Sequence, residues 1–307
     1  NYRSSKITGI FYCWMCYLVK TMTLIQDKIL SGERPLYGSR DLRLERVTIG
    51  EGESALKECS HIEAHDCEIQ GMYVFWECED VECRNCHFTP DDRAPLWYGK
   101  NIRMHDCIVD APKVFRELDG LILENVQMSD GAEAFWYCKN GHLSDLTMQR
   151  AEYAFMQSNK LQINNLILQG KYTFQYARNI EIHNAVLDTK DAFWESEDCT
   201  IYDSDVKGEY LGWYARNLRL VRCRISGTQP LCYCENLIIE DCVFAPDADL
   251  AFEHSSVEAT ILSPVTSIKN PKSGIIRCQT VGEYIHDADA KAPDDCRLCL
   301  LDAPLGQ

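Results

Sequence analysis

The chain has 307 residues, of which 46% are apolar, so it is long and apolar enough to bury a substantial core. Its formal net charge is −16, and a surface this acidic repels phosphate backbones and anionic lipid headgroups. We therefore expect neither nucleic acid nor a membrane as a partner.

Seventeen cysteines are spread over the sequence. Their number is odd, and the chain is far longer than the small secreted domains that depend on disulfides. We therefore expect a cytoplasmic protein in which most cysteines are small apolar core residues. The spacing leaves open whether those residues are thiols or disulfides.

Residues 1–21 differ from the rest of the chain. Residues 7–19 read ITGIFYCWMCYLV, an apolar run of 13 residues, whereas about 20 are needed to span a bilayer. The small-x-small cleavage site of a signal peptide does not follow this run. We interpret residues 1–21 as a non-native or disordered extension, with Met22 as the natural start.

Residues 22–38 are expected to cap the N-terminal end of a sheet. The segment 23–30 reads TLIQDKIL, with apolar residues at Leu24, Ile25, Ile29 and Leu30. Because the open end of a sheet pairs with other chains unless it is covered, we interpret this segment as a helix or turn that plugs that end.

Between residues 39 and 244 the chain repeats itself. The phrase YARN occurs at residues 176–179 and again at 214–217, and each time an apolar residue follows, which we call the anchor. Equivalent anchors recur at intervals of 19 to 21 residues. They are Leu42, Ile62, Val81, Ile102, Leu121, Gly141, Leu161, Ile180, Cys199, Leu218 and Leu237.

Further apolar columns stand six positions before each anchor and two, five and seven positions after it; Phe115, Leu123, Val126 and Met128 are one such set. Apolar residues two apart indicate short strands with one face inward. Asn or Asp recurs four positions after most anchors and directly before many of them, as at Asp66 and Asn179. These residues tolerate the left-handed backbone of a tight bend.

Three short strands per 19 to 20 residues, with every column in register, predict an all-β, right-handed parallel β-helix of about 11 coils. A leucine-rich repeat is the alternative, but the turn-rich half of each repeat leaves no room for its helix. Residues 245–307 lose the anchor phrase and are expected to form irregular final coils and a C-terminal cap.

Several segments of this repeat resemble a bacterial family known as domain of unknown function 3737. The resemblance is carried by SGERPLYG (31–38), AFWYCKN (134–140), DAFWESEDC (191–199), LGWYARNL (211–218), SGTQPLCYCENL (226–237) and KNPKSG (269–274), and it extends from about residue 22 to the end. It implies a right-handed β-helix of pectate-lyase-like architecture. The family has no established activity, so it supplies no catalytic residues.

Two neighbouring columns form the candidate ligand-binding surface. The first, five positions before the anchor, holds Trp76, Trp97, Trp136, Trp194 and Trp213; the second holds Tyr98, Tyr137, Tyr176 and Tyr214 between carboxylates. Aromatic faces stack on sugar rings and carboxylates bind hydroxyls, so this ridge predicts carbohydrate binding or processing. Aromatic rings also stabilise sheets, and exposed rings form interfaces. The alternative is therefore a non-enzymatic scaffold in which the ridge is a homo-oligomer or partner interface.

Catalytic candidates are few and carry little specificity. Cleavage of a glycosidic bond needs two carboxylates about 5 Å apart, or about 6.5–9.5 Å apart for inversion. Any solenoid offers such pairs, and here the candidates are Glu77, Glu117, Asp191 and Glu195, with Arg116 as a base for lyase chemistry.

No metal or cofactor is expected. The Asn and Asp columns are better explained by hydrogen bonds within stacked turns, and Cys83 and Cys86 fall on inward columns. Cys296 and Cys299 in the tail retain a minor zinc interpretation. The sequence contains no Gly-rich phosphate loop, nucleophile elbow or dinucleotide fingerprint.

Overall fold

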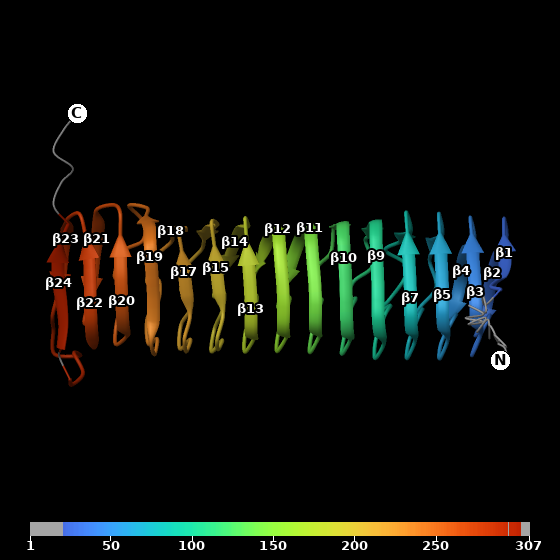
Figure 1. Cartoon of the computed structure of the whole chain (residues 1–307), viewed down its shortest axis with the longest axis horizontal. Coiled ribbons are helices and arrows are strands. Elements are labelled where there is room, and N and C mark those ends of the chain that lie inside the picture. The colour runs from blue at the N-terminus through green and yellow to red at the C-terminus, as the bar shows by residue number, and fades with distance from the viewer. Residues whose placement is uncertain (1–20, 294, 302–307) are drawn as a thin grey trace, which may run out of the picture.

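The computed structural model describes residues 21–293 and 295–301. The N-terminal extension expected at residues 1–21 therefore lies almost entirely outside the described residues. Within the described ranges the protein is a parallel β-solenoid without helices (Figure 1). In Figure 1 the front strands rise while the chain advances from right to left, so the solenoid is right-handed, as predicted.

One strand from each coil builds the long front sheet, and fifteen strands stack there in parallel. They are β1 (Thr23–Gln26), β3 (Arg40–Glu45), β5 (Ser60–His65), β7 (Glu79–Arg84), β9 (Lys100–Val109), β10 (Asp119–Met128), β11 (Lys139–Glu152), β12 (Asn159–Lys171), β13 (Arg178–His183), β15 (Thr200–Tyr202), β17 (Arg219–Val221), β19 (Leu237–Phe244), β20 (Ser256–Ile261), β22 (Ser273–Cys278) and β24 (Asp295–Leu300).

A second stack follows the bend after each front strand. It contains β2 (Ile29–Glu33), β4 (Thr48–Glu53), β6 (Glu68–Ile69), β8 (His87–Phe88), β14 (Val186–Lys190), β16 (Asp205–Lys207) and β18 (Arg224–Ser226). The long strands β9 to β12 and β19 run through the bend and belong to both stacks. Near the C-terminus, β21 (Val265–Lys269) pairs with β23 (Val281–Ile285) as a separate two-stranded sheet.

The pairing register confirms that equivalent positions of successive repeats lie over one another. Leu42 pairs with Ile62, and Ile62 with Val81. The stack has more coils than the eleven expected, because it continues beyond the recognisable anchors at both ends. Thr23 pairs with Leu42 at one end, and Gly274 pairs with Cys296 at the other. Neither Thr23 nor Gly274 carries the apolar signature of an anchor.

The segment 23–30 was expected to be a helix or turn. This prediction is wrong, because the segment forms β1 and the start of β2. The reason is that Ile25 lies over Leu44 and Leu30 over Ile49, so both side chains extend the inward columns of the next coil. Among the described residues no coil precedes them, and their neighbours Leu24 and Ile29 are 50% and 76% exposed.

A single apolar core runs the length of the solenoid and contains the anchors and the four further apolar columns. Its most regular part is a stack of five phenylalanines with ring centroids 4.5–4.8 Å apart: Phe115, Phe135, Phe155, Phe174 and Phe193. All five are fully buried. The stacking contributes about 0.5–1.5 kcal/mol per pair beyond the area that the rings bury.

The phenylalanine segment differs from the third strand that the sequence predicted. It is a run of turns, because alternate residues hold a left-handed backbone; in one coil Glu133, Phe135 and Tyr137 have φ of 55°, 63° and 58°. Coil-to-coil bonds still fix its register. The amide of Phe135 donates to Val114 in the preceding coil, and the amide of Tyr137 donates to Met156 in the following one.

The Asn and Asp columns are left-handed bends joined by side-chain hydrogen bonds, as interpreted from the sequence. Asp66 and Asn85 have φ of 53° and 51°, and Asn85 Nδ2 donates to Asp66 Oδ1 at 2.6 Å. The same bond recurs from Asn125 to Asp106, two coils further on. Within residues 21–293 and 295–301, no group of three or more His, Cys, Asp or Glu side chains is arranged to hold a metal ion.

All fifteen cysteines in the described part of the chain are free, and thirteen of them are buried. Cys83 and Cys86 are core residues, as predicted. Burial raises the pKa of Cys138 and of Cys232 to about 12, which keeps these thiols protonated and unreactive at neutral pH. The described residues also contain no helix of the length and hydropathy needed to cross a membrane.

Candidate functional site

The five tryptophans lie in one column, as the repeat predicted, and all are half-buried. The rings of Trp76 and Trp97 stack with centroids 5.1 Å apart and 8° between their planes. In the next coil, the guanidinium carbon of Arg116 lies 4.2 Å from the Trp97 ring centroid and 4.4 Å from that of Trp136. The cation therefore continues the stack between two indoles.

Most of the indole N–H groups are engaged by the neighbouring coil. Trp97 Nε1 donates to the carbonyl of Lys113 at 2.6 Å, Trp136 to Tyr153 at 2.7 Å, and Trp213 to Gln229 at 2.8 Å. The indole of Trp194 instead donates to the carboxylate of Glu195 at 3.3 Å. Where the rings stack, their planes lie across the solenoid axis, so that each face points toward the neighbouring coil. We call this column the indole ladder, and its contacts tie coils together.

The tyrosines of the next column are the exposed part of the ridge. Tyr98, Tyr137, Tyr176 and Tyr214 are 42%, 45%, 40% and 44% exposed. The Tyr98 ring stands at 86° to both Trp76 and Trp97, so its plane runs along the solenoid axis. The Tyr214 ring stacks on Tyr233 with centroids 4.7 Å apart. We call these four residues the tyrosine row.

Acidic and amide side chains separate the tyrosines. Glu77, Glu117, Gln157 and Glu195 occupy the same column on alternate coils, and all are exposed. Lys57 Nζ lies 3.5 Å from the Glu77 carboxylate and 4.0 Å from that of Glu58, so it bridges the first two acids of the column. The column thus presents carboxylates, an amide and phenol rings along one line.

The structure does not assemble the weak catalytic candidates into one distinctive site. The Arg116 guanidinium is held between two indoles and pairs with Glu133 at 3.1 Å, so it does not project outward as a base would. Asp191 is buried, and burial raises the pKa of its carboxyl, whereas Glu195 in the same coil is exposed. Glu77 and Glu117 stand two coils apart in a column that repeats the same spacing.

A hollow that the sequence did not predict runs beside the tyrosine row. One cavity of about 390 Å³ contains Asn140, His142, Lys160 and Asn179 in its lining. A second, of about 130 Å³, shares Asn140 and His142 with it and reaches back to Asn101. Together they span the coils that carry Tyr98, Tyr137 and Tyr176.

Two glycines mark this hollow. Gly120 stands in the Asn and Asp column before the anchor, and Gly141 occupies an anchor position that is usually a large apolar residue. A Cβ on Gly120 would lie 2.8 Å from Asn101 Oδ1, and a Cβ on Gly141 would lie 3.2 Å from the Leu121 carbonyl oxygen. Both glycines are exceptions to their columns, and both line the hollow.

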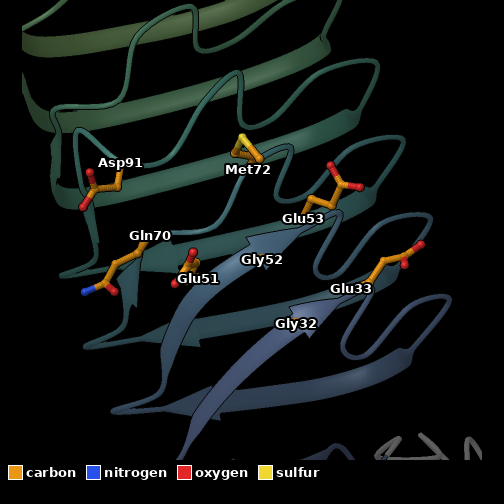
Figure 2. A pocket seen from close by; sticks show the side chains of 8 residues that line it. All are labelled: Gly32, Glu33, Glu51, Gly52, Glu53, Gln70, Met72 and Asp91. Atoms are coloured by element: carbon orange, nitrogen blue, oxygen red, sulfur yellow. The ribbon is translucent and has the colours of Figure 1, made fainter.

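A larger acidic hollow lies over the first coils (Figure 2). Its volume is about 750 Å³, and Glu33, Glu51, Glu53 and Asp91 line it together with Gln70 and Met72. Figure 2 shows Glu33 and Glu53 in equivalent places on successive coils, with Glu51, Gln70 and Asp91 grouped on the opposite side. Gly32 and Gly52 line the middle of the hollow and add no side chain to it.

Comparison with known proteins gives a family but no characterised relative. No curated protein matches the chain. Solved structures with a similar course include the A-module of the mannuronan C-5 epimerase AlgE4 from Azotobacter vinelandii, at 10% identity and a TM-score of 0.42, covering 92% of this chain and 91% of that one. The tailspike protein of E. coli bacteriophage HK620, in complex with a pentasaccharide, matches at 11% identity and a TM-score of 0.38, covering 90% and 72%. We draw no conclusion about ligand or activity from likenesses of this degree.

The sequence profile of one family, described as a protein of unknown function (DUF3737), matches residues 23–299. That match spans nearly all of the chain that the structure describes and includes every coil from β1 to within β24. The chain therefore belongs to the DUF3737 family.

Proposed function

We propose that this solenoid binds carbohydrate along the tyrosine row. The observation that carries the proposal is the repeated exposure of Tyr98, Tyr137, Tyr176 and Tyr214, each 40–45% open to solvent, in one column with two carboxylates and an amide between them. A phenol ring offers an apolar face to sugar C–H groups and a hydroxyl to sugar oxygens. The intervening carboxylates accept hydrogen bonds from sugar hydroxyls.

The indole ladder supports the row in this proposal and is not itself the contact surface. The Trp76 and Trp97 faces cover each other, and Arg116 lies on Trp97 and Trp136. Replacing Trp136 would therefore act first on stability, whereas Tyr137 is free to contact a ligand. The net charge of −16 favours a neutral glycan over an acidic one.

Binding to a glycan array, followed by titration calorimetry on the glycans that bind, tests the proposal. The double variant Tyr137→Ala, Tyr176→Ala is expected to lose most of the affinity while keeping the thermal stability of the wild type. Tyr37→Ala is the matched control, because Tyr37 is also 45% exposed and lies outside the row. Absence of wild-type binding to any glycan, or equal loss in the control, would reject the proposal.

A protein interface on the same row is the second candidate function. Exposed tyrosines in a line are typical of interfaces as well as of sugar sites, since tyrosine is enriched in both kinds of contact surface. In this case the protein would associate with itself or with a partner, and the double variant would shift the sedimentation of the wild type toward that of the monomer. A wild type that sediments as a monomer at high concentration would exclude self-association.

We also propose that the protein works in the cytoplasm. Thirteen buried and unpaired cysteines support a reducing environment, because buried thiols there need no protection from disulfide exchange. Recovery of the native protein from the oxidising periplasm with all of these thiols free would contradict the need for such an environment.

A further inference from the structure

The surface of the solenoid repeats every two coils as well as every coil. Four coils carry the pattern tyrosine, any residue, lysine or arginine, asparagine: YGKN at 98–101, YCKN at 137–140, YARN at 176–179 and YARN at 214–217. We call these segments the tyrosine modules. The coils before or between them carry ECED at 77–80, ELDG at 117–120, QSNK at 157–160 and ESED at 195–198.

Backbone hydrogen bonds fix the modules two coils apart. The amide of Tyr98 donates to Arg116, that of Glu117 to Trp136, and that of Tyr137 to Met156, each at 2.8–3.0 Å. Each of these bonds advances the column by one coil, and coils are separated by about 4.8 Å. Successive modules therefore stand about 10 Å apart along a rigid axis.

Contacts between coils explain the charged and amide positions of this pattern. Lys139 pairs with Asp119 at 3.3 Å, and Arg216 pairs with Glu197 at 3.1 Å. Asn140 Nδ2 also donates to Asp119 Oδ1 at 2.6 Å. When a coil with Lys, Arg or Asn side chains lies next to a coil with carboxylates, the side chains of both coils find hydrogen-bond partners. The alternation of these polar residues every two coils is therefore explained by stability alone.

The tyrosines are not explained in this way. No hydrogen bond engages the hydroxyls of Tyr98, Tyr137 or Tyr176 within residues 21–293 and 295–301, although each ring is at least 40% exposed. Their positive φ of 56–62° is a property of the column and not of the tyrosines, because Gln157 in the same column has a φ of 55°. Pairing of donors and acceptors between coils therefore does not account for the two-coil recurrence of the rings, and their exposed parts remain available for a contact outside the chain.

The last residues of three modules border the hollow, with Gly120 and Lys160 at the equivalent positions of the coils between them. Its lining includes Asn101, Asn140 and Asn179, which are the last residues of the first three modules. Each of these modules therefore presents a phenol ring at one end and a polar side chain bordering the hollow at the other. A ligand lying along the axis would meet the same pair of groups every second coil.

We infer that the ligand is a straight, neutral glycan whose sugars alternate in orientation, as in β-1,4-linked chains of pyranoses. In such a chain each sugar is turned over relative to the one before it, so every second sugar presents the same face to one side. One disaccharide would then match one pair of coils, and every second sugar would stack on a tyrosine. The inference rests on the carbohydrate binding proposed above and adds the class of glycan.

The dependence of affinity on chain length tests this match. Neutral β-1,4-linked oligosaccharides of increasing length should bind with affinity that rises whenever two sugars are added, until Tyr98, Tyr137 and Tyr176 are all covered, over about 19 Å. Each added stacking contact should strengthen binding about tenfold, which is about 1.4 kcal/mol. The α-1,4-linked oligosaccharides of the same sugar coil out of register and should show no such steps.

A swap of two side chains tests the spacing without changing composition. Tyr137 and Gln157 occupy the same column on adjacent coils, with φ of 58° and 55° and equivalent backbone bonds. The double variant Tyr137→Gln, Gln157→Tyr should fold as the wild type does, as judged by circular dichroism and thermal unfolding. It should bind the longer β-linked chains about tenfold more weakly, because its rings are no longer evenly spaced.

The outcomes separate this inference from the proposed function. Equal binding of α-linked and β-linked chains, or a swap variant that binds as the wild type does, would overturn the inference and leave carbohydrate binding in place. Failure of every oligosaccharide and array glycan to bind would overturn both. Steps of two sugars in the wild type, lost in the swap variant, would support both.

Discussion

At the scale of single residues, the most unusual property of this chain is the number of bulky side chains on a left-handed backbone. Phe135, Phe155 and Phe174 have φ of 57–63°, a conformation that large residues rarely adopt. Each such residue costs about 1–3 kcal/mol in isolation. The solenoid holds them there because their amides donate to the preceding coil and their rings stack on one another.

The buried carboxyl of Asp92 gives a prediction at this scale. Asp92 is fully buried, neither of its carboxylate oxygens has a hydrogen-bond partner in the described part of the chain, and burial raises the pKa of the group well above its usual range. The folded protein therefore keeps the proton at pH values where the unfolded chain has lost it. The stability that this protonation provides is complete below the ordinary pKa of a carboxyl and is lost as the pH rises through the raised pKa.

We expect Asp92→Asn to remove this pH dependence. At about pH 8 the variant should be more stable than the wild type by about 1–3 kcal/mol, and at about pH 5 the two should be close, as measured by urea unfolding. Asp91→Asn is the control, because Asp91 is the exposed neighbour of Asp92 in the same loop. A wild-type stability that rises between these pH values, with the variant following it, would contradict the assignment.

Residue types predicted some of these conformations and not others. The left-handed bends at Asn85 and Asp66 could be predicted, because both residue types adopt that conformation readily. Their side chains also form a hydrogen bond between coils. Phe135 and Tyr137 gave no such signal, because nothing in a bulky side chain favours a positive φ. Their conformation is imposed by the neighbouring coils. For that reason the segment that we expected to be a third strand is a series of turns.

At the scale of the structural element, some neighbouring coils come into direct backbone contact at the end of their second strands. Gly227 has a φ of 102°, and a Cβ there would lie 2.3 Å from the carbonyl oxygen of Gly208 in the coil before. The same close approach joins Gly208 to Thr189, where a Cβ would lie 2.2 Å from the carbonyl oxygen. Absence of a side chain, and not only backbone freedom, is required at both positions.

Gly227→Ala is therefore expected to cost more than the ordinary strain of alanine on a left-handed backbone. Gly38→Ala measures that strain alone, because Gly38 has a φ of 66° and open space where its Cβ would lie. We expect Gly38→Ala to lower the free energy of unfolding by about 1 kcal/mol and Gly227→Ala to lower it by about 2–4 kcal/mol. Equal losses in denaturant unfolding would show that the two coils separate freely at this point.

The number and ends of the elements were harder to predict than their repeat. The register from Leu42 to Leu237 follows from apolar residues that return at fixed intervals. Beyond it, Thr23 and Gly274 occupy equivalent places without a large apolar residue, so the pattern ends before the fold does. Terminal coils have one covered side instead of two, which relaxes the demand for a large apolar anchor.

At the scale of the whole molecule, stability comes from neighbouring coils only. Fifteen front strands share one core, but each pairs only with the strands of the coils directly before and after it. The two end strands carry exposed apolar residues, including Leu24 at 50% and Leu300 at 62%. The ends therefore have fewer contacts to lose than the centre.

Amide hydrogen exchange is expected to follow this order. Protection should be greatest in β10, β11 and β12 and should fall toward β1 and β24, because opening an end coil breaks one interface and opening a central coil breaks two. Exchange followed by mass spectrometry on overlapping peptides measures this profile. Uniform protection from β1 to β24 would indicate that the solenoid opens only as a single unit.

The sequence predicted which residues share the tryptophan and tyrosine columns, but it did not predict the contacts that these side chains make. A period of about twenty residues placed Trp97, Arg116 and Trp136 in one column, yet it could not show that the cation would lie between the indoles. The same period placed Tyr98 and Glu117 in one column and showed tyrosines between carboxylates, but it did not show how exposed the rings would be. The lining of the hollow beside them includes Gly120 and Gly141, which appear in the sequence only as exceptions to their columns.

The order in which the coils are stacked is also the order in which the ribosome makes them. Each coil packs on the coil synthesised about twenty residues earlier. The N-terminal coils can therefore fold before the C-terminal ones have been made. The growing end of the solenoid is covered again with each new coil, as β1 is covered by β3. The solenoid can therefore fold during translation, one coil after another. A pause in synthesis would leave a shorter solenoid whose completed coils remain folded.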